Sequence, residues 1–346
     1  MSENVALSAS RPAETDEIPI IDVSDYLAGE PGALDECAAQ LRHAYEDVGF
    51  WFLRGHDIPK ALIDRMFAET ARFHAMPLDD KLALKINHHN IGYLPMKGGS
   101  TRHSDIVKNT KPNLNEAVFI KRELAPDHPD ILSGKRFRGA NQWPNNLPGF
   151  KETALAYAAA MERLCLAILP IYAVALGVKP NYFDEAFKEP QFNLRLSHYP
   201  SFDALAADEY GLAPHSDTSF MTLLAPNKIA GLVIQTSAGQ WIEAPVIENA
   251  FIVNSCDLLR RWSNDRFRAT PHAVINRSGV ERYAIPFFFD TTCDYEMSCL
   301  PSCQSANNPP KYEPVTYFDY MTRYQALNYD HAPAEDKAKF AQAEPG

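Results

Sequence analysis

The sequence is short of positive charge: 33 lysines and arginines stand against 44 acidic residues, and the net charge is −11 at pH 7. Nucleic-acid binding depends on lysines and arginines clustered against phosphates, so we do not expect nucleic acid as the main partner. We find no apolar run near the length of a membrane span and expect no membrane partner. The start, "MSENVALSASRPAETDEIP", lacks the basic residues and apolar block of a signal peptide, so we expect a cytoplasmic protein.

The sequence also lacks the cysteine spacings that would define a zinc site or a disulfide framework. It has six cysteines, and none of them forms the CxxC pair that zinc sites typically use. Without a secretion signal, reduced thiols are expected. Internal repeats and low-complexity stretches are absent too. What remains is an ordinary globular composition, 46% hydrophobic and 22% charged over 346 residues, which is enough for one large domain or two ordinary ones. The oligomeric state stays open.

Predicted helices dominate the first half of the chain, and predicted strands dominate the second. "FKETALAYAAAMERLCLAILPIYAVALG" has the strongest helical pattern, and Pro170 is expected to kink or split that helix. From residue 191 onward, short β-rich segments bounded by Gly, Pro, Asn or Ser are typical of an antiparallel sandwich or barrel. One β-core with a helical N-terminal buttress fits this pattern better than two independent domains. We predict a flexible tail at 1–17, a mixed helical region at 18–185, a β-core with a closing helix at 186–330, and a tail at 331–346.

The pattern His-x-Asp occurs three times, at His103–Asp105, His128–Asp130 and His215–Asp217. On a strand, residues i and i+2 point to the same face, so the pattern can present an imidazole nitrogen beside a carboxylate oxygen. The copy at His215–Asp217 heads a good strand, "TSFMTLLA", and an isolated His272 follows several predicted strands later. Two histidines and one carboxylate that leave three positions open are the ligands of non-haem Fe(II) oxygenases. Spacing alone leaves a metal site and a structural role about equally open. The other two copies are expected to be solvated loop residues.

Arg282 supports the metal-site interpretation. It follows His272 and opens the apolar segment "RYAIPFFFD". An arginine on an apolar strand is costly unless it meets an anion, and its planar guanidinium suits a carboxylate. Arg282 could therefore hold the far end of a small dicarboxylate whose near end chelates the metal. An edge-strand arginine in water and a structural ion pair are the alternatives.

Taken together, these residues resemble the Fe(II)- and 2-oxoglutarate-dependent dioxygenases, in the branch similar to isopenicillin N synthase. The resemblance covers nearly the whole chain, from "IPIIDVSDYL" through "APHSDTSFMTLL" and "RATPHAVIN" to "ERYAIPFFFD". It implies an α+β fold with a mainly β core, a distorted double-stranded β-helix (jelly-roll), beside the helical N-terminal buttress. It also implies that Fe(II) is held by His215, Asp217 and His272, with 2-oxoglutarate as the cosubstrate and O2 as the oxidant.

The resemblance implies cosubstrate-binding residues as well. Arg282 would bind the C5 carboxylate of 2-oxoglutarate, and Tyr199 in "LRLSHYP" would line the cosubstrate site. Ser197 stands where many members carry an asparagine near that site. The family often shows Arg-x-Ser, whereas this sequence has Ala284 in place of the serine. A second hydrogen bond to the carboxylate is therefore missing, which leaves room for chemistry that does not use 2-oxoglutarate.

The reaction that the resemblance implies is the oxidation, by hydroxylation, of a small organic molecule, with release of succinate and CO2. Desaturation and ring closure are variants. We expect Tyr93 and Arg102 to contribute to a substrate lid, and Phe220 to form scaffold or a dry wall near the metal. Three alternatives stay open: a 2-oxoglutarate-independent Fe(II) oxidase or cyclase, a metal-binding jelly-roll protein that is not an oxygenase, and an inactive binding protein. The sequence does not identify the substrate.

Overall fold

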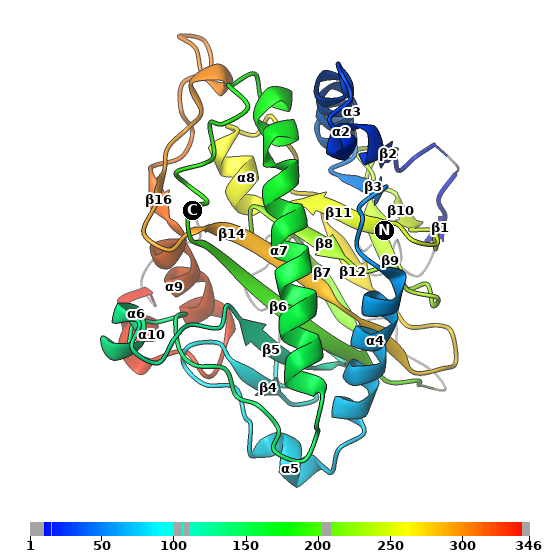
Figure 1. Ribbon diagram of the computed structural model, residues 1–346, viewed down its shortest axis with the longest axis vertical. Helices are drawn as coiled ribbons and strands as arrows, with labels where there is room; N and C mark the ends of the chain where they lie inside the picture. Colours follow the sequence, from blue (N-terminus) through cyan, green and yellow to red (C-terminus); the bar gives the residue numbers. More distant parts are fainter. Residues whose placement is uncertain (1–9, 15, 100–105, 107–110, 203–208, 341–346) are drawn as a thin grey trace.

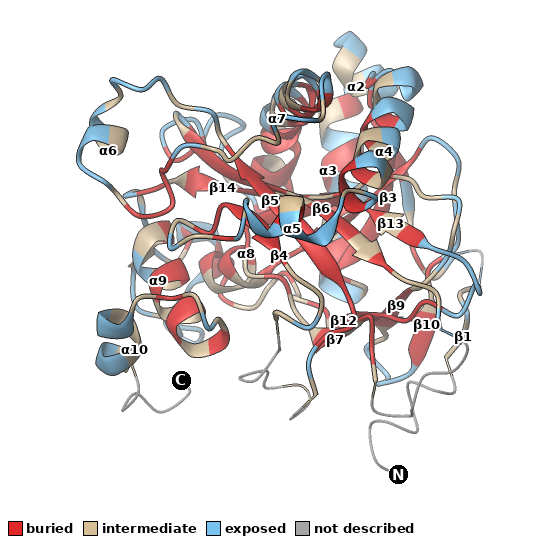
Figure 2. Cartoon of the chain, turned by 90° about the horizontal axis from the view of Figure 1, so that it is seen from below, coloured by how far each residue is buried: buried red, intermediate tan, exposed pale blue. Residues whose placement is uncertain are grey.

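Two β-sheets of unequal size form the centre of the molecule. The computed structural model describes residues 10–14, 16–99, 106, 111–202 and 209–340. The five-stranded sheet has the order β1-β10-β9-β12-β7, and the nine-stranded sheet has the order β2-β3-β11-β8-β14-β6-β5-β4, with β13 also paired to β6. Figure 2 shows the smaller sheet as a separate layer below the larger one. This arrangement agrees with the predicted jelly-roll core.

The strand bounds follow the short β-rich segments that the sequence predicts after residue 191. The smaller sheet contains β1 (Arg11–Pro12), β7 (Leu212–His215), β9 (Leu232–Gln235), β10 (Trp241–Glu243) and β12 (His272–Val274). The larger sheet contains β2 (Ile20–Asp22), β3 (Phe50–Arg54), β4 (Gly92–Leu94), β5 (Glu116–Lys121), β6 (Pro190–Tyr199), β8 (Met221–Leu224), β11 (Phe251–Ser255), β13 (Arg282–Ala284) and β14 (Pro286–Thr292). A separate hairpin pairs β15 (Glu296–Met297) with β16 (Val315–Thr316).

Helices cover one face of the larger sheet (Figure 1). The main core lies at this interface and takes buried apolar side chains from the helices and from β6, β8, β11 and β14. The opposite face of the sheet is left for the smaller sheet and for the space between the two. The helices are α2 (Ser24–Ala28), α3 (Ala33–Asp47), α4 (Lys60–His74), α5 (Leu78–Leu82), α6 (Pro129–Leu132), α7 (Phe150–Ala175), α8 (Asp257–Trp262), α9 (Tyr317–Asn328) and α10 (Ala334–Phe340), with a 3-10 turn at Pro301–Cys303.

The long helix α7 departs from two expectations. It continues through Pro170 and is not split there, because buried side chains on both sides of the proline hold it in the core. It is also long and apolar enough to cross a membrane by length and composition, so the expectation that no such run exists was wrong. Most of its apolar window is buried inside the protein, and core helices pass the same test.

The described parts of both predicted tails form secondary structure. Arg11–Pro12, inside the expected tail, forms β1 and pairs in parallel with β10. Near the other end, α10 packs against α9, and Asp336 forms an ion pair with the buried Arg136. Local sequence patterns indicate neither element, because each is held by contacts with distant residues.

The expected boundary near residue 185 does not separate two bodies. β5, from the N-terminal region, pairs with β6 along its whole length, from Glu116 opposite His198 to Lys121 opposite Asn193. β2 and β3 also belong to the larger sheet. The N-terminal region therefore adds strands and helices to a single β-core, as a buttress does.

Candidate active site

A cavity of about 130 Å³ lies between the two sheets. One buried water needs roughly 10–15 Å³ of such space. The cavity therefore has room for about ten waters, or for one small organic molecule. The smaller sheet contributes His215 and His272, and the larger sheet contributes Arg195 and Arg282. Residues of α9, including Tyr324, close another side.

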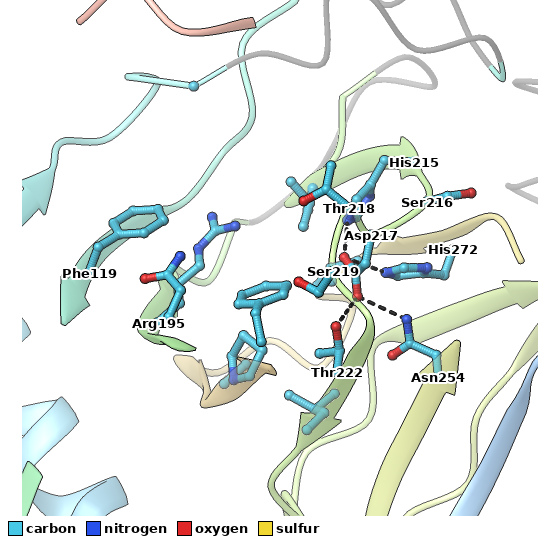
Figure 3. A pocket seen from close by; sticks show the side chains of 18 of the residues that line it. Phe119, Arg195, His215, Ser216, Asp217, Thr218, Ser219, Thr222, Asn254 and His272 are labelled. Carbon is cyan, nitrogen blue, oxygen red and sulfur yellow. Dashed lines mark hydrogen bonds and ion pairs between the residues drawn. The ribbon is translucent and has the colours of Figure 1, made fainter. Parts of the chain in front are cut away.

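His215, Asp217 and His272 converge at one point of this cavity (Figure 3). His215 ends β7 and His272 begins β12, and the two residues lie opposite each other in the antiparallel ladder. Asp217 Oδ1 is 3.4 Å from His215 Nε2 and 3.5 Å from His272 Nε2. Two ring nitrogens and one carboxylate oxygen therefore face a common centre, as a three-ligand metal face requires.

The other ring nitrogens fix the histidine tautomers. Nδ1 of His215 lies 2.9 Å from the Ala213 carbonyl, and Nδ1 of His272 lies 3.1 Å from the Thr270 carbonyl. A carbonyl only accepts, so each Nδ1 carries the proton and donates, and each Nε2 keeps its lone pair for a metal. Burial and the neighbouring His272 lower the pKa of His215, which favours the neutral ligand form.

Asp217 does not lie on a strand, contrary to the expectation for the His-x-Asp pattern. It lies in the connection between β7 and β8, and two neighbouring strands orient it. Its Oδ2 accepts hydrogen bonds from Thr222 Oγ1 at 2.8 Å and from Asn254 Nδ2 at 2.9 Å (Figure 3). Although burial opposes the charge, the two imidazoles hold the pKa of Asp217 well below its usual range. Oδ1 is thereby left as an anionic ligand atom.

Arg282 is a buried cation whose hydrogen-bonding capacity is incompletely used. Its side chain is 2% exposed, and its Nη1 has no hydrogen-bond partner. Nε donates to the Ile229 carbonyl at 3.2 Å, and the guanidinium lies 5.3 Å from the ring centre of Tyr199, which also lines the cavity. Gly231 packs against this arginine, since a Cβ there would lie 3.1 Å from Nε. A buried guanidinium with a free donor beside a cavity is suited to bind an anion.

The structure places the remaining predicted site residues less favourably. Ser197 is fully buried and is not among the residues that line the cavity, although Tyr199 on the same strand face is.

Tyr93 faces the helix side of β4, where its hydroxyl donates to the buried Glu116. Phe220 packs among aromatic residues of the main core. It lies in a bend just before β8, where strand alternation does not hold, and Ser219 lines the cavity instead. Neither residue lines the cavity, so a lid contact by Tyr93 and a dry wall near the metal at Phe220 were wrong predictions, whereas Phe220 does belong to the scaffold. Arg102 lies outside the described residues.

Two cations in the cavity, Arg195 and Lys121, were not predicted from the sequence. Arg195 lies between Leu194 and Leu196 on β6. Like Arg282, it is a charged residue on an apolar strand, which is costly unless an anion compensates for the charge. Thr222 and Asn254 were also missed, and no sequence signal distinguishes them from other polar strand residues.

A second group of possible ligands, His74, Glu116 and His198, lies behind the cavity on the helix side of β5 and β6. Glu116 accepts hydrogen bonds from His198 Nδ1 at 2.8 Å, from Lys81 Nζ at 2.8 Å and from the Tyr93 hydroxyl. Despite its burial, these donors hold the pKa of Glu116 well below its usual range. A carboxylate already occupied by a lysine and a tyrosine is better explained as a structural network.

The His128–Asp130 copy of the repeated pattern is also occupied. His128 Nδ1 accepts from the Asp130 backbone N–H at 3.1 Å and caps α6, while the Asp130 carboxylate accepts from Arg138 Nε at 2.8 Å. These groups and Glu189 form another set with ligand atoms near one another, but the protein's own cations bind them. The copy at His103–Asp105 lies outside the described residues.

Comparison with known proteins gives consistent results. The model of the non-haem dioxygenase N-terminal region, described as acting in morphine synthesis, matches residues 18–146, and the 2OG-Fe(II) oxygenase superfamily model matches residues 190–291. The 2-oxoglutarate-Fe(II) type oxidoreductase hxnY of Emericella nidulans is 34% identical, with 92% of each chain covered. The 2-oxoglutarate-dependent dioxygenase citB of Monascus ruber is 32% identical over 90% of this chain and 96% of its own.

Two solved structures are similar over most of their length. A full-length Neurospora crassa protein in complex with alpha-KG and thymine superposes with a TM-score of 0.78 at 28% identity, covering 91% of this chain and 98% of that one. The rice dioxygenase for auxin oxidation gives a TM-score of 0.69 at 26% identity, covering 89% and 94%.

Proposed function

Because the chain belongs to the 2OG-Fe(II) oxygenase superfamily, we propose that His215, Asp217 and His272 are the ligands of its Fe(II). The protein is a 2-oxoglutarate-dependent dioxygenase that acts on a small molecule. The observation that carries the ligand assignment is the convergence of two Nε2 lone pairs and one free carboxylate oxygen. This donor set fits Fe(II), which accepts imidazole and carboxylate and needs open positions for its reactants.

Arg282 is proposed to bind the C5 carboxylate of 2-oxoglutarate through its unpartnered Nη1. Tyr199, beside the guanidinium, would form the wall next to that carboxylate. Ser197 would act from behind this wall, since it lies opposite Ala284 in the ladder between β6 and β13 and its buried hydroxyl has no partner. Because it does not line the cavity, we assign Ser197 a role in packing the cosubstrate site and no direct contact.

The residues of the chain contribute orientation, charge and exclusion of water. When bound, Fe(II) and 2-oxoglutarate supply the activation of O2 that oxidises a C–H bond of the substrate, yielding succinate and CO2. Thr222 and Asn254 hold the Asp217 carboxylate in one orientation. Phe288 and Phe50 make part of the cavity wall apolar, which limits water near a reactive centre. We propose hydroxylation as the outcome, with desaturation or ring closure depending on the substrate.

The test of this function is stoichiometric. Anaerobic protein is loaded with Fe(II) and 2-oxoglutarate and exposed to O2, and succinate is measured. Even without a prime substrate, slow uncoupled turnover should yield succinate. A chain that consumes O2 without succinate would be a 2-oxoglutarate-independent oxidase, and one that does neither would be no oxygenase.

The ligand assignment is tested separately by iron binding under anaerobic conditions. His272→Ala removes one of three protein ligands and should weaken Fe(II) binding by about 100-fold or more. His43→Ala is the matched control, because His43 is an exposed residue of α3. Full iron affinity in His272→Ala would overturn the assignment even if succinate forms.

A further inference from the structure

Two cationic side chains face the cavity across from the proposed iron ligands. Figure 3 shows Arg195 and Phe119 on one side and the three ligands on the other. Phe119 lies opposite Arg195 in the ladder between β5 and β6, and the guanidinium lies 5.2 Å from its ring centre. Nε of Arg195 is buried and has no hydrogen-bond partner. The aromatic ring thus holds the arginine in place without satisfying its donors.

Lys121 is the second cation, two residues further along β5. It is 4% exposed and lines the cavity. Among the described residues, its ammonium makes no hydrogen bond or ion pair, and it lies 5.9 Å from the centre of the Phe137 ring. A buried ammonium with so few contacts is unfavourable unless a ligand compensates for its lost hydration.

The charge of the described cavity lining is unbalanced once the cofactors are counted. Two carboxylates of 2-oxoglutarate and Asp217 match the two charges of Fe(II) and that of Arg282. What remains in the lining is Lys121 and Arg195 against one carboxyl group, Asp290. Asp290 is itself engaged, because Oδ1 accepts the Phe220 backbone N–H at 2.9 Å. The substrate side of the cavity therefore has an excess of at least one positive charge.

Three polar atoms of neutral side chains in the same lining are buried without a partner, and two of them are donors. Gln325 is fully buried, its Oε1 accepts from Arg136 Nη2 at 2.9 Å, and its Nε2 is left without a partner. Nδ2 of Asn115 is likewise buried and unpartnered, and Oδ1 of Asn193 is an unpartnered acceptor. Free donors favour an acceptor-rich ligand, since each buried donor left unpaired costs roughly 1–3 kcal/mol.

The walls between these polar groups are flat and apolar. Aromatic rings from the larger sheet, from α9 and from the residue that follows α9 line the cavity, together with one methionine: Phe119, Phe288, Tyr324, Tyr329 and Met321. With the small volume given above, these walls fit a compact ring or short chain better than a long flexible molecule.

We propose that the prime substrate is a small monocarboxylic acid with a flat or apolar body, and that Arg195 and Lys121 bind its carboxylate at the end of the cavity opposite the iron. This inference rests on the proposed function, since it takes the other end to be filled by Fe(II) and 2-oxoglutarate. The body of the acid would then lie along the aromatic walls and direct a C–H bond toward the iron.

The experiment uses pairs of acids and their amides, which have the same shape but differ in charge. Benzoate, phenylacetate and hexanoate are titrated into anaerobic protein loaded with Fe(II) and 2-oxoglutarate, alongside benzamide, phenylacetamide and hexanamide, and dissociation constants are measured by calorimetry. At least one acid should bind about 10- to 100-fold more tightly than its amide, the range expected for hydrogen bonds to a charged group. If no acid is preferred, including the case in which no probe binds, the proposal is overturned.

Variants then identify the side chains that cause the preference for acids over amides. Arg195→Met and Lys121→Met should each reduce the acid-to-amide ratio by about tenfold, whereas Arg195→Lys should restore most of it. The ratio is the readout because partial loss of folding or of iron lowers both affinities together. Lys188→Met is the control, since it removes the same charge from an exposed position just before β6. If the acid-to-amide ratio is unchanged in both Met variants, other groups cause the preference, and the assignment to Arg195 and Lys121 is overturned.

Failure of the proposed function and failure of the proposed substrate class would give different results. Wild-type protein that makes no succinate from 2-oxoglutarate contradicts the proposed function. Protein that makes succinate but binds amides as well as acids contradicts only the substrate class.

Discussion

At the scale of single residues, Ala284 is the clearest departure from the family pattern. It lines the cavity and lies on the same strand as Arg282, two residues further on. Residues i and i+2 of a strand face the same way, so a hydroxyl at position 284 would lie beside the guanidinium that we assign to the cosubstrate. The alanine removes one donor to a carboxylate.

Restoring this hydroxyl should tighten cosubstrate binding. Ala284→Ser is expected to lower the Kd for 2-oxoglutarate by about 3- to 10-fold, toward the lower end of what a hydrogen bond to a charged group contributes. Calorimetry on the anaerobic Fe(II) protein measures it. Ala284→Cys is the matched control, because a thiol has similar size but donates weakly. Equal tightening by serine and cysteine would indicate filled space in place of a hydrogen bond.

Lys121 gives a residue-scale pH prediction. Burial lowers its pKa to about 8, against the opposing effect of the Asp290 carboxyl; Cys293 and Arg138 are the other charged or titratable groups acting on it. The ammonium is present below that pKa and lost above it, so the KM of an acid substrate should rise as pH increases beyond about 8. The KM of the matching amide should not.

The control for this prediction is Lys121→Met, which cannot titrate at that position. Its KM for the acid should be high already at neutral pH and nearly flat from about pH 7 to 9.5, because no lysine is left to lose its charge. An alkaline rise in KM that persists in this variant would assign the titration to another group.

At the scale of elements, β8 and β11 orient Asp217, the proposed iron ligand that does not lie on a strand. Asp217 depends for its orientation on Thr222 of β8 and Asn254 of β11. Loss of a residue that orients a ligand typically weakens metal binding about 10- to 100-fold. Thr222→Val is therefore expected to weaken Fe(II) binding by about tenfold in anaerobic titrations, with little change in shape.

Thr291→Val is a close control for this experiment. Thr291 is also a fully buried strand threonine, but its hydroxyl has no hydrogen-bond partner. It should leave iron affinity unchanged and keep or slightly raise the thermal stability. Equal losses of iron in the two variants would indicate a general packing effect.

The turn that precedes β9 supports Arg282 in a similar way. Gly231 has φ of +143°, and a Cβ there would lie 3.1 Å from Arg282 Nε and 3.0 Å from the Ile275 carbonyl. Gly231→Ala should displace the guanidinium and raise the Kd for 2-oxoglutarate by about tenfold or more, while iron binding stays within about threefold. Gly239→Ala also strains a positive φ, +78°, but has open space around its Cβ, so it should affect stability and leave Kd unchanged.

The same elements show how far sequence reasoning reached. Strand positions were predictable because short apolar segments are separated by turn residues, and the convergence of His215 with His272 followed from strands folding back. Which face a side chain takes was less predictable. Phe220 was expected near the metal, but the chain bends just before β8, so strand alternation does not hold there and the ring packs in the core. Arg195 carried the same signal as Arg282, whereas the roles of Thr222 and Asn254 depend on tertiary contacts that no local pattern contains.

At the scale of the whole molecule, the proposed cofactors would connect the two sheets. His215 and His272 belong to the five-stranded sheet, and Arg282 belongs to the nine-stranded sheet. Asp217 lies in the connection that passes from one sheet to the other. Iron held by the histidines, and 2-oxoglutarate bound to that iron and to Arg282, would therefore span the cavity between the sheets.

This arrangement predicts that the two cofactors stabilise the fold cooperatively. A ligand at about 100 times its Kd stabilises the folded state by about 2.7 kcal/mol, so saturation with both should raise Tm by roughly 7 °C for a chain of this size. Because bound iron would form part of the 2-oxoglutarate site, the shift with both should exceed the sum of the shifts with each alone. Anaerobic thermal scans of wild type and His272→Ala measure this. The variant should lose the combined shift, and strictly additive shifts in the wild type would mean that the two ligands bind apart and do not bridge the sheets.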